Sequence, residues 1–327
     1  IALSGYMPAS GGDVTFSMIQ PRQERTVTHN SLKNDVENGQ VIENSAIGIE
    51  NGKITMIADA TRIRLDKNKY KKIINAAGKQ VYPGLIACNT NLGLTEIDLV
   101  RSTRDFYEVG QMNPNVRAII AYNTDSKIQA TVRSNGVLLA QIVPQGGIIS
   151  GQSSVVQLDG WNWEDAAVKV DDGIHLNFPR SQAQRGFGKE ENKNEGNSAY
   201  DNQLNELKKF FTDAKAYVAQ NTKDEKNLRF EAMKGIFNGT QNLYIHTDYV
   251  KDILSALNFC KDFDLKKIVL VGAKDAWKCT KEIKTAGASV MINRVHDLPQ
   301  YSDEDIDEPF KLAAQLAKDS ILFCIQK

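Results

Sequence analysis

The stretch GKQVYPGLIACNTNLG, residues 78–93, decides the fold. After a glycine turn it continues as the apolar run VYPGLIAC, residues 81–88, which is typical of a strand covered on both faces. Residues 41–59 precede it and contain two alternating runs joined by Glu50-Asn51-Gly52. Asn-Gly is the strongest short-range signal for a β-hairpin. The chain therefore changes near residue 80 from hairpins to longer buried strands.

Beyond residue 88, apolar runs alternate with helical stretches. The clearest helix covers residues 203–220, where apolar residues recur at intervals of three and four. Two more helices are predicted over 249–263 and 273–286. This alternation predicts a parallel sheet, and its strand number favours a barrel over an open sheet. The predicted strands are 84–88, 136–143, 173–178, 242–246, 266–272, 288–293 and 320–325.

Two stretches interrupt the alternation. Residues 144–165 are glycine-rich and then aromatic, which predicts either a structural turn or a loop that binds an anion through backbone N–H groups. Residues 180–202 are polar and mixed in charge, which predicts a long surface loop. Neither stretch contains a Gly-Lys-Ser/Thr or a GxGxxG motif.

Composition excludes several classes of protein. The 327 residues include 40 Lys and Arg against 40 Asp and Glu, so the net charge is zero. There is no basic stripe for nucleic acid and no run of 18 apolar residues for a membrane span, so we expect neither partner. The chain opens on Ile1, and we expect it to be processed or incomplete at the front. The cysteines have no Cys-x-x-Cys spacing, and their apolar surroundings favour buried thiols: Cys88, Cys260, Cys279 and Cys324.

Residues 78–93 resemble a passage of the amidohydrolase superfamily, most closely its imidazolonepropionase-like branch. In that family a small β-sandwich leads through Gly-Lys-x-Val-x-Pro-Gly-Leu-Ile into the first barrel strand. Residues 51–54, 242–248 and 265–295 are similar to other parts of the family pattern, so the likeness covers roughly 41–327. The resemblance implies a TIM-type (β/α) barrel over 81–327 and a β-sandwich portion over 1–80. Because the chain stops after Gln326-Lys327, we expect the barrel to be incomplete and the C-terminal part of the sandwich to be missing.

This chain departs from the family at the first strand. The family has Asp-x-His-x-His there, whereas this chain has Ala87, Asn89 and Asn91. A carboxamide oxygen is a poor, uncharged ligand for zinc compared with imidazole nitrogen. The usual first-strand metal clamp is therefore absent, and Asn89 and Asn91 become candidates for binding a polar substrate by hydrogen bonds.

Only two of the four histidines, His175 and His246, lie in predicted strands. His246 falls on a family ligand position, so the resemblance implies a residual ligand for a divalent metal such as zinc; a core histidine remains the alternative. His175 matches no family ligand position and is a candidate for substrate binding or for the core. Acidic residues after the first strand offer another route, a Mg²⁺ or Mn²⁺ site, or are solvated ion pairs: Glu96, Asp98, Asp105, Glu108 and Asp125.

Two hypotheses about function remain open. In the first, the protein hydrolyses C–N bonds other than peptide bonds, in a cyclic amide or small N-acyl substrate, at the barrel mouth. In the second, it is a catalytically inactive relative that binds a small molecule or pairs with an active subunit, so homo- and hetero-oligomers are both open. The resemblance implies a periplasmic or secreted location. Function belongs to the site and not to the fold, so the geometry of these side chains must discriminate.

Overall fold

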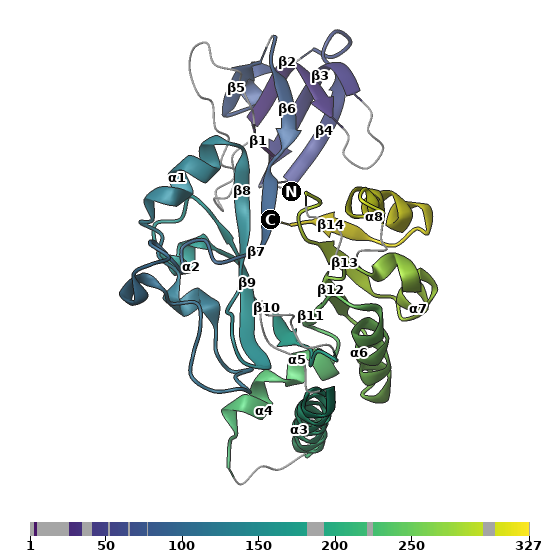
Figure 1. The fold of residues 1–327 in the computed structure, drawn as a ribbon. Coiled ribbons are helices and arrows are strands. Elements are labelled where there is room, and N and C mark those ends of the chain that lie inside the picture. Colours follow the sequence, from purple (N-terminus) through teal and green to yellow (C-terminus); the bar gives the residue numbers. More distant parts are fainter. Residues whose placement is uncertain are drawn as a thin grey trace. The chain divides into compact units, whose positions relative to one another are not determined.

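The computed structural model describes residues 3–4, 26–34, 41–51, 53–64, 66–76, 78–181, 193–220, 225–296 and 305–326 (Figure 1). The chain divides into two compact units. The first comprises Ile1–Ala87, Thr124–Ala140 and Val156–Ala166, and the second comprises Cys88–Asn123, Gln141–Val155 and Ala167–Lys327. Within the described ranges, every helix is too short or too polar to cross a lipid bilayer.

The first unit contains a six-stranded sheet. The strands β3 and β4 pair antiparallel through a turn at Asn51, whose φ of 52° is a left-handed conformation that asparagine tolerates. This confirms the hairpin predicted over residues 41–59, although Gly52 itself lies outside the described residues. Ile47 and Ile49 pack with Val81 in a small core. The sheet order is β1-β6-β2-β3-β4, with β5 pairing β2: β1 (Leu3–Ser4), β2 (Thr26–Asn34), β3 (Val41–Glu50), β4 (Lys53–Asp59), β5 (Lys72–Asn75) and β6 (Gln80–Pro83).

A second sheet has eight strands in the order β14-β13-β12-β11-β10-β9-β8-β7. From β10 to β14 every neighbouring pair is parallel, as the alternation of strands and helices predicted. The strands are β7 (Leu85–Thr90), β8 (Val137–Ile142), β9 (Ile149–Gln157), β10 (Ala167–Asn177), β11 (Asn242–Thr247), β12 (Ile268–Gly272), β13 (Ser289–Ile292) and β14 (Phe323–Ile325).

The strand β9 was not predicted, because residues 144–165 read as a loop. Asn177 N donates to Ile148 O at 2.8 Å, and Ser153 Oγ donates to Gly173 O at 3.3 Å. Since one residue number rises as the other falls, β9 runs antiparallel to β10. Its polar side chains are buried but bonded; Gln152 Nε2, for example, donates to Pro114 O at 2.9 Å. These long-range bonds make a polar stretch compatible with a buried strand.

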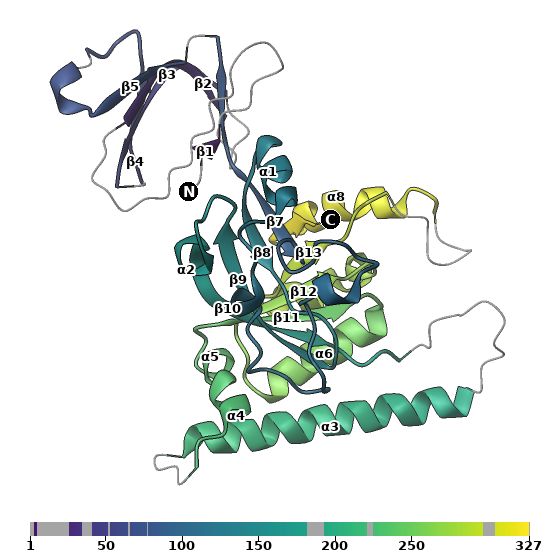
Figure 2. The ribbon, with the colours of Figure 1, turned by 90° about the vertical axis from the view of Figure 1, so that its left-hand side faces the viewer.

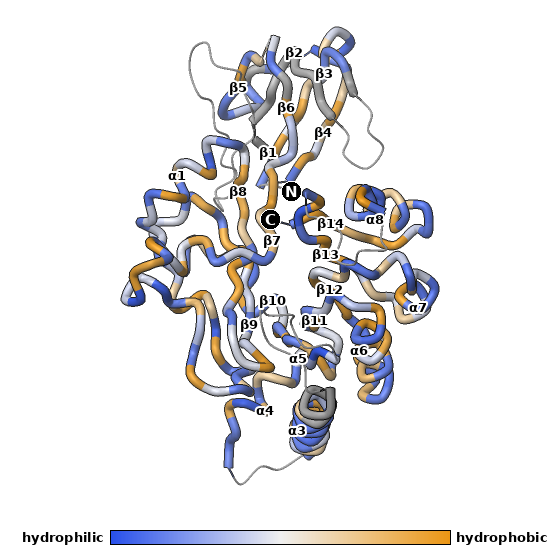
Figure 3. Tube along the Cα trace, viewed as in Figure 1, coloured by the Kyte–Doolittle hydropathy of each residue, from blue (hydrophilic) through white to orange (hydrophobic). Residues whose placement is uncertain are grey.

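Helices cover the outer side of the second unit's parallel strands, as Figures 1 and 2 show for α6 to α8. In Figure 3, apolar and polar residues alternate along these helices. The helix predicted over 273–286 is interrupted and forms η4 and α7. The helices are η1 (Lys67–Lys69), η2 (Arg101–Thr103), η3 (Ala118–Ala121), α1 (Lys127–Ser134), α2 (Trp163–Ala166), α3 (Lys193–Ala219), α4 (Leu228–Ala232), α5 (Lys234–Phe237), α6 (Val250–Asp262), η4 (Ala276–Cys279), α7 (Thr280–Thr285) and α8 (Glu308–Lys318).

The helix α3 corrects the prediction of a surface loop over residues 180–202. Residues 193–202 belong to the helix, and residues 182–192 lie outside the described part of the chain. Tyr200 OH lies 3.0 Å from Ser255 Oγ on α6, and Lys251 Nζ lies 5.9 Å from the centre of the Tyr200 ring. These contacts with α6 stabilise a helical start that has no apolar periodicity of its own.

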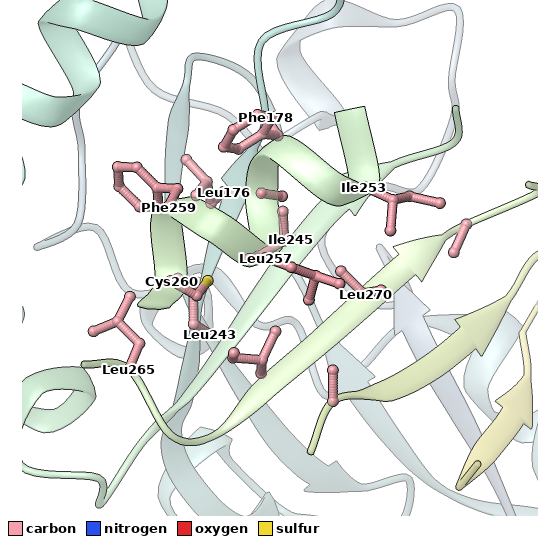
Figure 4. Close-up of a cluster of buried hydrophobic side chains, with 14 of the residues drawn as sticks. Leu176, Phe178, Leu243, Ile245, Ile253, Leu257, Phe259, Cys260, Leu265 and Leu270 are labelled. Carbon is pink, nitrogen blue, oxygen red and sulfur yellow. The ribbon is translucent and has the colours of Figure 1, made fainter. Parts of the chain in front are cut away.

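The main core lies between β10, β11, β12 and the helices (Figure 4). On α6, the residues Ile253, Ala256, Leu257 and Cys260 are buried. Their spacing of three, one and three places them on one helical face. That face packs against alternate residues of the strands, namely Ile174, Leu176, Leu243, Ile245, Ile268 and Leu270.

Candidate functional site

The candidate site lies on the face of strands β10 to β14 that points away from α6, which we call the inner face. Successive side chains of a strand point to opposite faces. Because Leu243 and Ile245 face α6, Tyr244 and His246 face inward. Register pairs His175 with Tyr244 and Asn177 with His246. The inner face is defined by His175, Asn177, Tyr244, His246, Val271, Met291 and Cys324.

The structure brings His175 and His246 together. His175 Nδ1 lies 2.9 Å from His246 Nε2, so one imidazole donates a hydrogen bond and the other accepts it. The side chain of His175 is fully buried, and His246 is half-buried. The second ring nitrogen of His175, Nε2, is buried and has no hydrogen-bond partner among the described residues. The hydrogen bond between the two histidines therefore leaves His175 Nε2 available as a donor or acceptor on the inner face.

Burial keeps both imidazoles neutral. It lowers the pKa of His175 well below its ordinary value, and the nearby His246 lowers it further. Burial also lowers the pKa of His246 to about 4, with a smaller contribution from the Arg180 guanidinium. Desolvation disfavours the charged form of a base, which explains the direction of both shifts. At neutral pH the pair is an uncharged donor and acceptor.

A hydrogen-bond network continues from this pair into the sheet. The Tyr244 ring stacks on His175, with ring centroids 4.5 Å apart, and its hydroxyl donates to Asp172 Oδ2. Gln141 Nε2 donates to the same carboxylate oxygen at 3.4 Å, and Gln141 Oε1 accepts from Asn89 N at 3.1 Å. Lys169 pairs with the other carboxylate oxygen of Asp172. The buried carboxylate is thus compensated, as a buried charge must be.

The two first-strand asparagines have different surroundings. Asn89 reaches the network through its backbone N–H and has a φ of 49°, a left-handed conformation in which asparagine is enriched. Asn91 Nδ2 donates to Thr95 Oγ1 at 3.4 Å, a weak bond within its own loop. The structure therefore connects Asn89, but not Asn91, to the residues around His175.

These side chains do not fit a metal centre of the kind that the resemblance implies. His175 and His246 direct ring nitrogens at each other, and the side chains of Asn89 and Asn91 are carboxamides, which are poor ligands for zinc. Across the described ranges, no three or more His, Cys, Asp or Glu side chains are placed to bind one metal ion. This applies also to the acidic residues after β7; Glu96, for example, accepts from Asn123 Nδ2 at 3.0 Å. Zinc sites ordinarily need at least three protein ligands.

Sequence reasoning missed Asp248, which follows β11 directly. Burial raises the pKa of Asp248, while the cations Lys274 and Arg180 lower it. A carboxyl group with a raised pKa at the carboxyl end of a barrel strand is a candidate acid or base. The available signal was its position two residues after His246. Asp172, Tyr244 and Gln141 were missed because their partners lie far away in the sequence.

Gly272, the last residue of β12, makes room for Asp248. Its φ is 90°, and an added Cβ would lie 2.4 Å from Asp248 Oδ1. We expect Gly272→Ala to lower the free energy of unfolding by roughly 2–3 kcal/mol, from backbone strain and displacement of the carboxylate. The matched control is Gly287→Ala, which has a φ of 64° and open space for a Cβ, and should lose roughly 1 kcal/mol. Equal losses in urea denaturation would show that the contact with Asp248 is unimportant.

Known proteins resemble this chain in fold and not in sequence. No family model matches the sequence, and no curated protein matches it. A crystal structure of an amidohydrolase from Thermotoga maritima MSB8 is similar, with a TM-score of 0.73 and 18% identity, covering 92% of this chain and 78% of that one. A molinate hydrolase structure covers 93% of this chain and 73% of its own at 12% identity, with a TM-score of 0.44.

The similarity to the Thermotoga maritima protein concerns the fold. It supports the predicted α/β class and an architecture of the amidohydrolase type. The comparison shows the fold alone, so the imidazolonepropionase-like branch and the roles of Asn89, Asn91, His175 and His246 stay predictions.

Proposed function

We propose that this chain is an amidohydrolase-fold protein that binds a small, neutral, polar molecule at the inner face and does not perform metal-dependent hydrolysis. The observation that supports this most directly is the hydrogen bond between His175 and His246. Each imidazole satisfies the other, so neither nitrogen of that bond is free to coordinate an ion. Asn89 and Asn91 stand where further imidazoles would be needed.

The chemistry of the inner face favours an amide-like ligand. Carboxamides and neutral imidazoles both donate and accept hydrogen bonds, which matches the C=O and N–H groups of a cyclic amide or a small N-acyl compound. The unused Nε2 of His175 would supply one such bond.

A second candidate function is hydrolysis of a C–N bond other than a peptide bond, and Asp248 favours it. Its raised pKa suits a group that must accept a proton from water and return it to a leaving amine. Half-buried His246 lies two residues away. In this alternative the amide ligand is a substrate, and Asn89 and Asn91 position it.

Two measurements on purified protein discriminate these functions. The first is elemental analysis after expression with added zinc or manganese, and the second is an assay of cyclic amides and N-acyl compounds for both binding and turnover. The proposal expects far less than one ion per chain, and binding without hydrolysis. Stoichiometric metal together with hydrolysis, both lost in His246→Ala and retained in the exposed-residue control His296→Ala, would overturn it.

Location and assembly are proposed on the resemblance alone. We propose a periplasmic or secreted protein, which cell fractionation would test. We also propose that the chain forms an oligomer, either a homo-oligomer or a hetero-oligomer with a catalytically active relative. Light scattering of the purified protein would detect the homo-oligomer.

A further inference from the structure

The two end strands of the eight-stranded sheet each contain a cysteine, and the thiols of these two cysteines lie next to each other. Cys88 belongs to β7 and Cys324 to β14, which are the opposite ends of the sheet order (Figure 1). The two side chains are nevertheless hydrogen-bonded to each other. Neither cysteine is part of a disulfide and both are half-buried, so the prediction of a buried thiol is wrong at these two positions. It is confirmed at Cys260 and Cys279.

Both thiols lie on the inner face. Cys324 pairs in register with Met291, and Met291 with Val271. Val271 pairs with His246, so Cys324 continues the row of inward-facing residues. Cys88 also lies near Asp172, because the charge of that carboxylate raises the pKa of the Cys88 thiol slightly against the stronger effect of Cys324. The contact therefore joins the first and last strands of the sheet through side chains.

The surroundings distinguish this pair from the other two cysteines. The hydrogen bond from Cys324 lowers the pKa of the Cys88 thiol to about 7, whereas the pKa of Cys324 is raised. Burial raises the pKa of Cys260 and Cys279 to about 12. Because the thiolate is the nucleophile, Cys88 is the thiol that reacts first.

We propose that Cys88 and Cys324 are a disulfide-forming pair that links β7 covalently to β14. The oxidant is a second disulfide, of a small molecule or of a protein. The Cys88 thiolate attacks one of its sulfurs and releases the other as a thiolate, which leaves a mixed disulfide on Cys88. Cys324 then loses its proton and attacks the Cys88 sulfur, releasing the second thiol. Two protein thiols are oxidised and one external disulfide is reduced to two thiols.

The bond would close a loop from residue 88 to residue 324, which encloses the eight-stranded sheet except parts of its end strands β7 and β14. Closing a long loop restricts the unfolded chain and so raises stability. It would also fix the distance between the end strands of the sheet, and hence the width of the inner face that they border.

The test uses oxidised glutathione on the full chain. We expect the loss of two of the four free thiols, a peptide pair linked through Cys88 and Cys324 in mass spectrometry, and a higher thermal midpoint that dithiothreitol reverses. In Cys324→Ser, the reaction should stop at glutathione bound to Cys88. In Cys88→Ser, thiol loss should become much slower. Cys260→Ser and Cys279→Ser serve as controls and should retain the linkage.

Three results would overturn the proposal. One is retention of all four thiols in the oxidised wild-type chain. Another is a wild-type mixed disulfide on Cys88 that Cys324 never resolves. The third is a linked peptide that contains Cys260 or Cys279. All three are measured on the wild-type chain, so a variant that fails to fold does not obscure them.

Discussion

A Phe211→Ala variant is expected to lose roughly 3–5 kcal/mol of unfolding free energy. Phe211 lies on α3 and is fully buried. Its ring centroid lies 4.9 Å from that of Phe259, 5.4 Å from that of Phe263 and 6.1 Å from that of Phe237. Truncation removes these three aromatic contacts together and leaves a cavity between α3, α5 and the C-terminal end of α6, which these elements cannot easily close.

Urea denaturation followed by circular dichroism measures this loss. The control is Phe310→Ala on α8, where the side chain is 53% exposed and the expected change is below roughly 1 kcal/mol. A loss at Phe211 no larger than at Phe310 would mean that α3 is not part of the cooperative core. Residues 193–219 would then unfold independently.

The helix around Phe211 shows what the sequence could predict. The intervals of three and four between Leu204, Leu207, Phe211 and Ala214 predicted one apolar face, and the last three of these residues are fully buried. Such a pattern is local, so it is visible without a structure. The start of α3 at Lys193 is not local, because it depends on the contact of Tyr200 with α6. Periodicity therefore placed the helix but not its first turns.

The strand β9 shows a different limit. Ser150, Gln152, Ser153 and Ser154 read as a loop because buried positions are usually apolar. Their partners lie on other elements; Ser153 bonds to Gly173 and Gln152 to Pro114. Since a buried polar group is tolerated once it is bonded, the strand becomes predictable only after its neighbours are known.

The candidate site has some features that a local sequence pattern predicts and others that depend on partners far away in the sequence. His175 and His246 were found from the sequence because each lies in a strand run, and the resemblance marked His246. Their mutual bond depends on the register that sets Asn177 beside His246 and His175 beside Tyr244. The carboxylate of Asp172 accepts hydrogen bonds from both Tyr244 and Gln141. It follows Asp171, whose φ of 52° interrupts the regular alternation of side chains between the two faces of β10. No hydrophobic periodicity in the sequence predicts the left-handed conformation at Asp171.

Acidification gives the second large effect. The native pKa of His246 is about 4, below its ordinary value of 6.5, because burial penalises the charged ring. Between pH 6.5 and pH 4 the unfolded chain therefore binds a proton at this position that the native chain does not. Stability contributed by neutral His246 is complete above pH 6.5 and falls as pH decreases through this window, by roughly 3 kcal/mol in total. The pKa of His175 is shifted in the same direction, so it adds to the loss.

The carboxylates of the chain also titrate over part of this range, so a variant must isolate the imidazole. The amide of His246→Gln can still bond to His175 Nδ1 but does not titrate in this range. Between pH 6.5 and pH 4 we therefore expect the free energy of unfolding to fall by roughly 3 kcal/mol less in this variant than in wild type. His296→Gln is the matched control for replacing a histidine by glutamine, because the His296 side chain is exposed. Unfolding free energies from urea titrations at several pH values provide the comparison.

Equal acid losses in wild type and His246→Gln would have a specific meaning. They would show that the folded pair accepts a proton and shares it between His175 Nδ1 and His246 Nε2. A shared proton requires compensation by a nearby negative group, and Asp248 is the carboxylate closest in sequence to His246. Such a result would favour proton transfer at this site, and with it the hydrolytic function over simple binding.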